Sequence, residues 1–343
     1  MILRSLSSPA KVILERVFPA KNRSFEMDVL AKILIWVAPA VAMTIFGVVF
    51  GIIGAAAPIE ESHGGAEHSG KILVWVDRKG REERIPAPAG EYRHPRISPD
   101  GTQVAVTVNL DGAKSREIRI WDLIRKTMTR FADNGGSPVW TPDGKRIVFA
   151  SSRDGKFVLL WKAVDGSEEV EQLVSARDRL FTPFCWSGDG KSLVVYEAPL
   201  NIEATTDIGI ISVEGNHNHS LLLHDRHYNS QPRISPDGHW IAYTSDESGR
   251  NEVFVRPYPQ LSKGKWQITT GGADAPLWSP DGRELFFRSG GAVMMVPVIS
   301  GPAFRFDKQR TLFRGNYFVI SGHNYQTFEI SPDGKRFLMM KIV

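Results

Sequence analysis

A turn motif that recurs six times is the feature of this sequence that most constrains its fold. The motif is Ser/Thr-Pro-Asp-Gly, with Gly188 replacing proline in the third copy. Its last two residues are Asp100-Gly101, Asp143-Gly144, Asp189-Gly190, Asp237-Gly238, Asp281-Gly282 and Asp333-Gly334, and successive aspartates are 43, 46, 48, 44 and 52 residues apart. Proline presets φ, aspartate bonds nearby amides and glycine accepts the left-handed conformation. Each copy therefore predicts a tight turn, which we expect Gly188 to loosen without removing it.

Short apolar runs flank every turn. The runs Ile147–Ala150 and Leu193–Tyr196 are apolar at every position, which is typical of strands buried on both faces. A second strand pair follows in each repeat, for example Glu117–Asp122 and Met128–Phe131. Four short strands per repeat of this length predict an all-β, six-bladed β-propeller.

The two ends of the repeat region complement each other. The sixth motif is followed by only one strand, Arg336–Met340, which leaves the last blade two strands short. Two further strands precede the first motif, at Lys71–Val76 and Glu82–Ile85. We therefore expect these N-terminal strands to pair with the C-terminal ones and to close a propeller over residues 71–343, which removes the exposed sheet edges.

These tracts resemble a known family. Trp-Ser-Pro-Asp-Gly, followed by an apolar strand and by Thr244–Val253, is similar to the TolB-like β-propeller repeats, and the resemblance covers all six copies. The segment Leu73–Glu83 also resembles the extracytoplasmic propellers of bacterial transmembrane Ser/Thr kinases. The kinase motifs themselves, a Gly-rich loop, His-Arg-Asp and Asp-Phe-Gly, do not occur here.

A long uncharged segment precedes the repeats. Residues 33–59 contain no charged side chain, and as a helix they would reach roughly 40 Å, enough to cross a membrane. Residues 1–32 carry six basic and three acidic side chains. This bias predicts a cytoplasmic leader at 1–32, a single transmembrane helix at 33–59, a linker at 60–70 and a propeller outside the cytoplasmic membrane of a bacterium.

Two other interpretations of this segment remain. Ala55-Ala56-Ala57 resembles a signal-peptide processing site, but the apolar stretch is longer than a typical signal core and Pro58 would follow the cut. A buried helix of a globular protein is disfavoured because the segment is apolar all round. An uncleaved anchor is the favoured interpretation.

Composition excludes several classes of function. The net charge is +4 and the basic residues are scattered, which disfavours nucleic acid as a partner. Cys185 is the only cysteine, so an intrachain disulfide and a thiolate metal cluster are excluded. We expect Cys185 to be a small buried side chain. No cofactor is expected.

The sequence offers no strong catalytic or metal-binding pattern. A Gly-x-Ser-x-Gly elbow is absent, and few residues outside the repeats remain for a hydrolase domain. Five histidines gather between His217 and His239, and the pair His217/His219 could ligate a metal. Turn-forming neighbours favour a solvated hairpin tip instead. We predict neither catalytic residues nor a metal site.

Partner binding is the predicted function. The loops opposite the Asp-Gly turns carry the aromatic, basic and amide side chains that suit docking, namely Tyr92, Arg93, His94, Arg179, Phe181, Tyr228, Asn229, His323, Asn324 and Tyr325. The first hypothesis is a non-catalytic scaffold or accessory subunit of an envelope membrane complex. The second is a sensor of a small ligand or peptide, and the third is a metal-dependent propeller hydrolase.

Overall fold

The computed structural model describes residues 70–343 apart from 111–114, 201–204, 300–302 and 320–324. The predicted leader, transmembrane helix and most of the linker lie outside these residues. Within the described part, no helical segment has the length and hydrophobicity that a membrane crossing requires. One short 3-10 helix, Leu261–Lys263 (η3), is present there.

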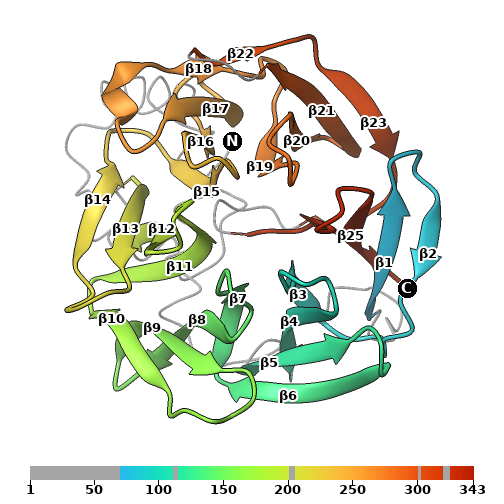
Figure 1. Ribbon diagram of the computed structural model, residues 1–343, viewed down its shortest axis with the longest axis vertical. Helices are drawn as coiled ribbons and strands as arrows, with labels where there is room; N and C mark the ends of the chain where they lie inside the picture. The colour runs from blue at the N-terminus through green and yellow to red at the C-terminus, as the bar shows by residue number, and fades with distance from the viewer. Residues whose placement is uncertain (1–69, 111–114, 201–204, 300–302, 320–324) are drawn as a thin grey trace, which may run out of the picture. The chain divides into compact units, whose positions relative to one another are not determined.

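The described residues form six antiparallel sheets around a common axis (Figure 1). The first three blades are Tyr92–Ile97 (β3), Gln103–Leu110 (β4), Ser115–Asp122 (β5) and Thr127–Asp133 (β6); Gly135–Trp140 (β7), Arg146–Arg153 (β8), Lys156–Ala163 (β9) and Glu171–Ala176 (β10); and Arg179–Trp186 (β11), Ser192–Pro199 (β12), Asp207–Ser212 (β13) and His219–Leu223 (β14). In each blade the first strand lies nearest the axis. The predicted four-stranded blade is confirmed.

The remaining blades vary this plan only at their outer edges. The fourth blade contains Asn229–Ile234 (β15), Trp240–Ser245 (β16), Glu252–Pro257 (β17) and Trp266–Gln267 (β18). The fifth contains Asp274–Trp278 (β19), Glu284–Ser289 (β20) and Ala292–Ile299 (β21), with Arg305–Phe306 (β22) and Arg310–Arg314 (β23) both paired to β21. The sixth contains Glu329–Ile330 (β24), Arg336–Ile342 (β25), Lys71–Asp77 (β1) and Glu82–Arg84 (β2).

The sixth blade closes the ring as the sequence predicts. Strand β1 pairs with β25 in an unbroken register from Lys71 opposite Ile342 to Asp77 opposite Arg336. Figure 1 shows the blue N-terminal strands beside the red C-terminal one. The ring therefore contains no blade that lacks its outer strands, and closure depends on hydrogen bonds between the two ends of the propeller.

Apolar side chains fill the spaces between neighbouring blades. Each of six hydrophobic clusters combines residues of two adjacent sheets, and together they follow the ring round once. The second strand of a blade contributes to both of its neighbours, as Val104 and Ala105 do on opposite faces of β4. This explains why those strands are apolar at consecutive positions.

The six turns contact one another in a second, smaller ring. A Cβ built on Gly144 would lie 3.6 Å from the ring of Pro99 in the preceding blade. At four other turns, a Cβ built on the glycine would lie 3.4–3.6 Å from the proline ring of the preceding blade. Blades three and four differ, because a Cβ on Gly188 would lie only 2.8 Å from Gly238 Cα. Gly188 therefore permits a closer backbone approach. The turn itself is kept, as the sequence predicts, because the amide of Gly190 still donates to the carbonyl oxygen of Ser187 at 2.9 Å.

Candidate functional site

The residues nearest the axis are set by one position of the repeat. Four residues before each turn aspartate stand Arg96, Val139, Cys185, Arg233, Leu277 and Glu329. The inner strands that carry them surround the axis, so side chains far apart in the chain can meet there (Figure 1). Three of the six are charged, although they lie in strands that are otherwise largely apolar.

A buried ionic network joins the blades across the axis. The Glu329 carboxylate accepts hydrogen bonds from Arg96 at 2.9 Å and from Arg233 at 3.4 Å. Both guanidinium groups also donate to the carbonyl oxygen of Phe184, at 3.0 and 3.1 Å. Burial and then the charge of Arg233 lower the pKa of Arg96 to about 10, and Glu329 opposes this effect. Four blades thus meet in one charged cluster.

Cys185 lies beside this network. Its thiol contacts the carbonyl oxygen of Pro232 at 3.5 Å, and the amide of Ile234 donates to its sulfur at 3.4 Å. Desolvation by burial raises the pKa of the Cys185 thiol. A thiol held in its neutral form is a weak nucleophile, which agrees with the structural role expected from the sequence.

A second polar layer lies two residues further from the turns. Gln231 donates to the carbonyl oxygen of Tyr325 at 2.9 Å, and its side-chain oxygen accepts from Thr244 and from the amide of Ala275, both at 2.8 Å. The Tyr325 ring stacks on His94, with centroids 5.2 Å apart. Blades one, four, five and six are therefore connected at this level of the axis.

His94 is a buried, neutral imidazole. Its Nδ1 lies 3.1 Å from the hydroxyl of Thr107, which accepts from the amide of Ser137 at 3.0 Å. The hydroxyl proton can then be donated to Nδ1, which places the imidazole proton on Nε2. Burial and then the charges of Arg96, Arg116 and Arg93 lower the pKa of His94 to about 3.

Besides His94, three of the predicted partner-contacting residues are buried. Tyr92 is 2% exposed and its hydroxyl donates to the carbonyl oxygen of Pro88. Phe181 packs edge-on against His219, and Asn229 donates to Asp225. These side chains fix the form of the loop face and present little surface to a partner.

The other predicted contact residues have more varied surroundings. Arg93, Arg179, Tyr228 and Tyr325 are half-buried and His94 is buried, whereas His323 and Asn324 lie outside the described residues. Arg179 pairs with the fully buried Glu197 at 3.3 Å, and the amide of Tyr228 donates to Asp246. His94 and Tyr325 meet at the axis, and Arg93 acts on His94 through its charge.

The histidine-rich segment pairs with carboxylates. His219 Nε2 donates to Glu197 at 2.5 Å, and His217 Nε2 contacts Glu171 of the neighbouring blade at 3.0 Å. His224 contacts Asp207 in the same manner. Among the described residues, no group of three or more His, Cys, Asp or Glu side chains is arranged to hold a metal ion. The expected solvated hairpin tip is present between β13 and β14, and its His217 also contacts blade two.

The turn aspartates have a structural role. In every turn the preceding Ser or Thr hydroxyl donates to the aspartate, as Thr141 does to Asp143 at 2.6 Å. The aspartate also accepts from a backbone amide two residues on. These hydrogen bonds lower the pKa of Asp100, Asp143, Asp189, Asp281 and Asp333.

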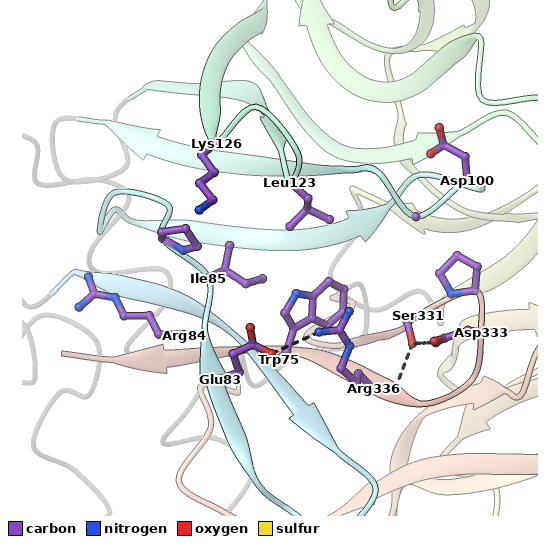
Figure 2. Close-up of a pocket in the computed structure, with 13 residues that line it drawn as sticks. Trp75, Glu83, Arg84, Ile85, Asp100, Leu123, Lys126, Ser331, Asp333 and Arg336 are labelled. Carbon is purple, nitrogen blue, oxygen red and sulfur yellow. Dashed lines mark hydrogen bonds and ion pairs between the residues drawn. The ribbon is translucent and has the colours of Figure 1, made fainter.

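A pocket of about 660 Å³ lies between the sixth and first blades, at the turn face (Figure 2). Its apolar lining includes Trp75, Ile85 and Leu123. Arg336 lies over the Trp75 ring at 4.7 Å and contacts Glu83 at 3.3 Å. Arg336, Glu83, Asp100 and Asp333 thus already have partners in the structure.

Sequence reasoning missed the ionic network of Arg96, Arg233 and Glu329. The available signal was the presence of charged side chains at one aligned position of an otherwise apolar strand. In a closed ring, equivalent positions of the inner strands face a common axis. Alignment of the six repeats by their aspartates would have identified the three residues together.

Comparison with known proteins agrees with this architecture. A TolB structure from Agrobacterium tumefaciens has a TM-score of 0.61 at 18% identity, covering 81% of this chain and 99% of that one. The TolB crystal structure from Acinetobacter baumannii has a TM-score of 0.51 at 17% identity, covering 82% of this chain and 66% of that one. At these identities the similarity shows the fold alone.

Sequence comparison adds one distant curated relative and one family. The Bacillus subtilis protein named uncharacterized peptidase YuxL is 25% identical over 208 residues, which are 47% of this chain and 31% of the relative. This chain thus spans less than a third of that relative's length. The family described as TolB beta propeller domain matches residues 66–255, more than half of the chain. Because that match covers more than half of the chain, including all of the first three blades, the chain belongs to the TolB beta propeller domain family.

Proposed function

We propose that this chain is a non-catalytic binding protein of the bacterial envelope, a scaffold or accessory subunit of a membrane complex. The observation that supports this proposal best is the difference between the two faces of the ring. One face consists of six closely similar turns, whereas the other carries individual side chains on connections of unequal length. Variable loops on a rigid scaffold are the usual location of binding residues.

The comparisons are compatible with a binding role. The two similar solved structures are named TolB, whereas the peptidase name belongs to a protein of which this chain covers 31%. The sequence contains no Gly-x-Ser-x-Gly elbow. A binding role for the loop face therefore needs no catalytic group, whereas a peptidase role would need one.

Anchorage by residues 33–59 is part of the proposal. The uncharged stretch and the basic leader before it are its basis. We expect the full chain to sediment with membranes and to remain there in alkaline carbonate, and a deletion of residues 33–59 to release it. Recovery of the full chain in the soluble fraction would contradict the anchor.

The docking face can be tested with paired variants. Tyr228→Ala and Arg226→Glu alter the loop face, and Lys145→Glu places a similar charge change on the opposite face. We expect a stoichiometric partner to co-purify with the full chain from gently solubilised membranes. Both loop-face variants should reduce its recovery, and the control should not. Equal recovery with all three variants would place docking elsewhere.

A second candidate function, recognition of a small ligand, is favoured by one separate observation. Several buried polar side chains around the axis have atoms without a hydrogen-bond partner among the described residues. A bound ligand could supply the partners that these atoms lack.

A further inference from the structure

Buried polar atoms without partners gather around the axis. Within the described residues, ten such side-chain atoms occur, and the two from Trp121 and Glu247 lie in other parts of the blades. The other eight belong to residues of the inner strands, of the segment just before β24, or of a strand paired with an inner one. They are Arg93 Nε, His94 Nε2, Ser230 Oγ, Arg233 Nε, Arg288 Nε and Nη1, Gln326 Oε1 and Thr327 Oγ1. Such atoms are rare in folded proteins because each costs about 1–3 kcal/mol.

The repeat places these groups at the loop end of the axis. Arg93, Ser230 and Gln326 all stand seven residues before a turn aspartate, and Arg288 pairs in register with Asp274, which holds the same position in blade five. His94 and Thr327 follow at the next position. The contact of Gln231 with Tyr325 and the stack of Tyr325 on His94 show that these strands meet at this level.

The inner strands share a backbone feature at this level of the axis. Four inner strands carry a β-bulge just after this level, and His94, Ser137, Gln231 and Ala275 have φ between 49° and 54°. Such a conformation is strained for residues other than glycine and is often found at functional sites. The same bulge and the same positive φ occur in four blades, so this backbone conformation is a regular part of the loop end of the axis.

The charge at this end is unbalanced. Five arginines lie here, Arg93, Arg96, Arg116, Arg233 and Arg288, together with the neutral His94. Two carboxylates lie among them, Glu329 between Arg96 and Arg233, and Asp274 opposite Arg288. Arg96, Arg233 and Arg288 are buried, whereas Arg93 is half-buried and Arg116 is exposed. An excess of positive charge in one place favours the binding of an anion.

Two of the arginines are available for such an anion. The side chains of Arg93 and Arg116 form no hydrogen bond or ion pair with any residue that the structure describes, and their charges both act on His94. The Arg116 guanidinium lies across the inner strand of blade two, where a Cβ on Gly136 would come within 3.4 Å of it. Glycine at this position thus leaves room for the guanidinium beside the axis.

We propose that the loop end of the axis binds a carboxylate group, with Arg93 and Arg116 as its principal cationic contacts and the Ser230 and Thr327 hydroxyls as further donors. Guanidinium groups suit both carboxylates and phosphates. The singly charged carboxylate fits better, because Glu329 and the oxygen of Gln326 would repel the second charge of a phosphate dianion. The group can come from a free organic acid or from an acidic side chain of a docked protein. This proposal does not depend on the docking function.

Calorimetric titration of the full chain in mild detergent tests the proposal. The probes are acetate, N-acetylglutamate amide and inorganic phosphate, each at constant ionic strength maintained with chloride. We expect both carboxylates to bind saturably and more tightly than phosphate. Binding of the blocked glutamate alone would identify a protein side chain as the source, and equal binding of acetate would identify a free acid.

Matched variants locate the binding. Arg93→Gln and Arg116→Gln should each weaken carboxylate binding about tenfold, the factor expected for one charge-assisted hydrogen bond. Both should also raise the melting temperature of the ligand-free protein, because each relieves the excess positive charge. Lys145→Gln, on the turn face, should change neither property. No carboxylate binding, tighter phosphate binding, or affinity unchanged in both arginine variants would overturn the proposal, whatever the partner experiment shows.

Discussion

The two ends of the inner strands differ in kind. At one end the same four-residue turn is repeated six times, with the same hydroxyl-to-carboxylate hydrogen bond in every blade. Four residues earlier, the six blades carry Arg96, Val139, Cys185, Arg233, Leu277 and Glu329. The repeated turns stabilise the ring, whereas the different residues at the axis determine which polar contacts form there.

This difference separates two kinds of stabilisation. The turn ring depends on close packing and short local hydrogen bonds, so each blade contributes a similar share. The axis depends on contacts such as Arg96 with Glu329, which are 233 residues apart and occur once. Substitutions at the two ends should therefore have effects of different size and different pH dependence.

Removal of the Glu329 charge should have the largest effect. Glu329→Gln leaves Arg96 and Arg233 buried without their carboxylate, and loss of one partner of a buried ion pair costs about 4 kcal/mol. Denaturant unfolding measures this loss. Replacement of all three residues by leucine should restore much of the stability, since apolar substitutes avoid the buried charge. A Glu329→Gln protein as stable as the parent would show that the network has no stabilising role.

Acidification should next affect His94. Its pKa is about 3 in the folded protein against 6.5 as the ordinary value, so below pH 6.5 the unfolded chain binds a proton that the native protein does not. Stability should fall as the pH drops, by about 3 kcal/mol between pH 6.5 and 4. Unfolding free energies across this range measure it. In His94→Gln this part of the pH dependence should disappear.

Restoration of proline to the third turn should destabilise the protein. The other five turns contain proline, but Gly188→Pro places a ring where a Cβ alone would lie 2.8 Å from Gly238 Cα. The expected cost is about 2 kcal/mol from overpacking. Pro142→Gly is the matched change in the opposite sense and should cost less. Stabilisation by Gly188→Pro would mean that the two turns can separate freely.

The turn aspartates should show the smallest effect, at lower pH. Hydrogen bonds lower the pKa of Asp143 below 3.8, so their contribution is present above that value and is lost as the pH falls through the lower folded value. Asp143→Asn should lower the unfolding free energy by a small, constant amount above about pH 4 and flatten its pH dependence below that value. A pH dependence below about pH 4 that is the same as in the parent would contradict this assignment.

The sequence predicts the scaffold well because its determinants are local. Turn chemistry, strand patterning and the count of strands at the two ends were sufficient for six blades and for the pairing of β1 with β25. The close approach of Gly188 to Gly238 was missed because the two residues are 50 positions apart in the chain. The contact of His217 with Glu171 was missed for a similar reason, since it joins two blades.

The candidate site was predicted only in outline. His94, Tyr325 and Arg93 were identified from the loops that carry them. Arg96, Arg233 and Glu329 were not, because a strand pattern alone does not tell which residue of an inner strand faces the axis. Burial of Tyr92, Phe181 and Asn229 depends on how neighbouring blades pack, which residue type does not reveal.

The pairing of the first and last strands brings the two ends of the propeller together, with the amide of Val343 donating to the carbonyl oxygen of Gly70 at 3.0 Å. A short peptide could therefore join residue 343 to residue 70, and new termini could be opened in a turn between two other blades. In such a circular permutant a different blade would be completed by strands from both ends. The closed ring of blades thus does not require the termini to lie in the sixth blade, and circularly permuted sequences should form the same fold.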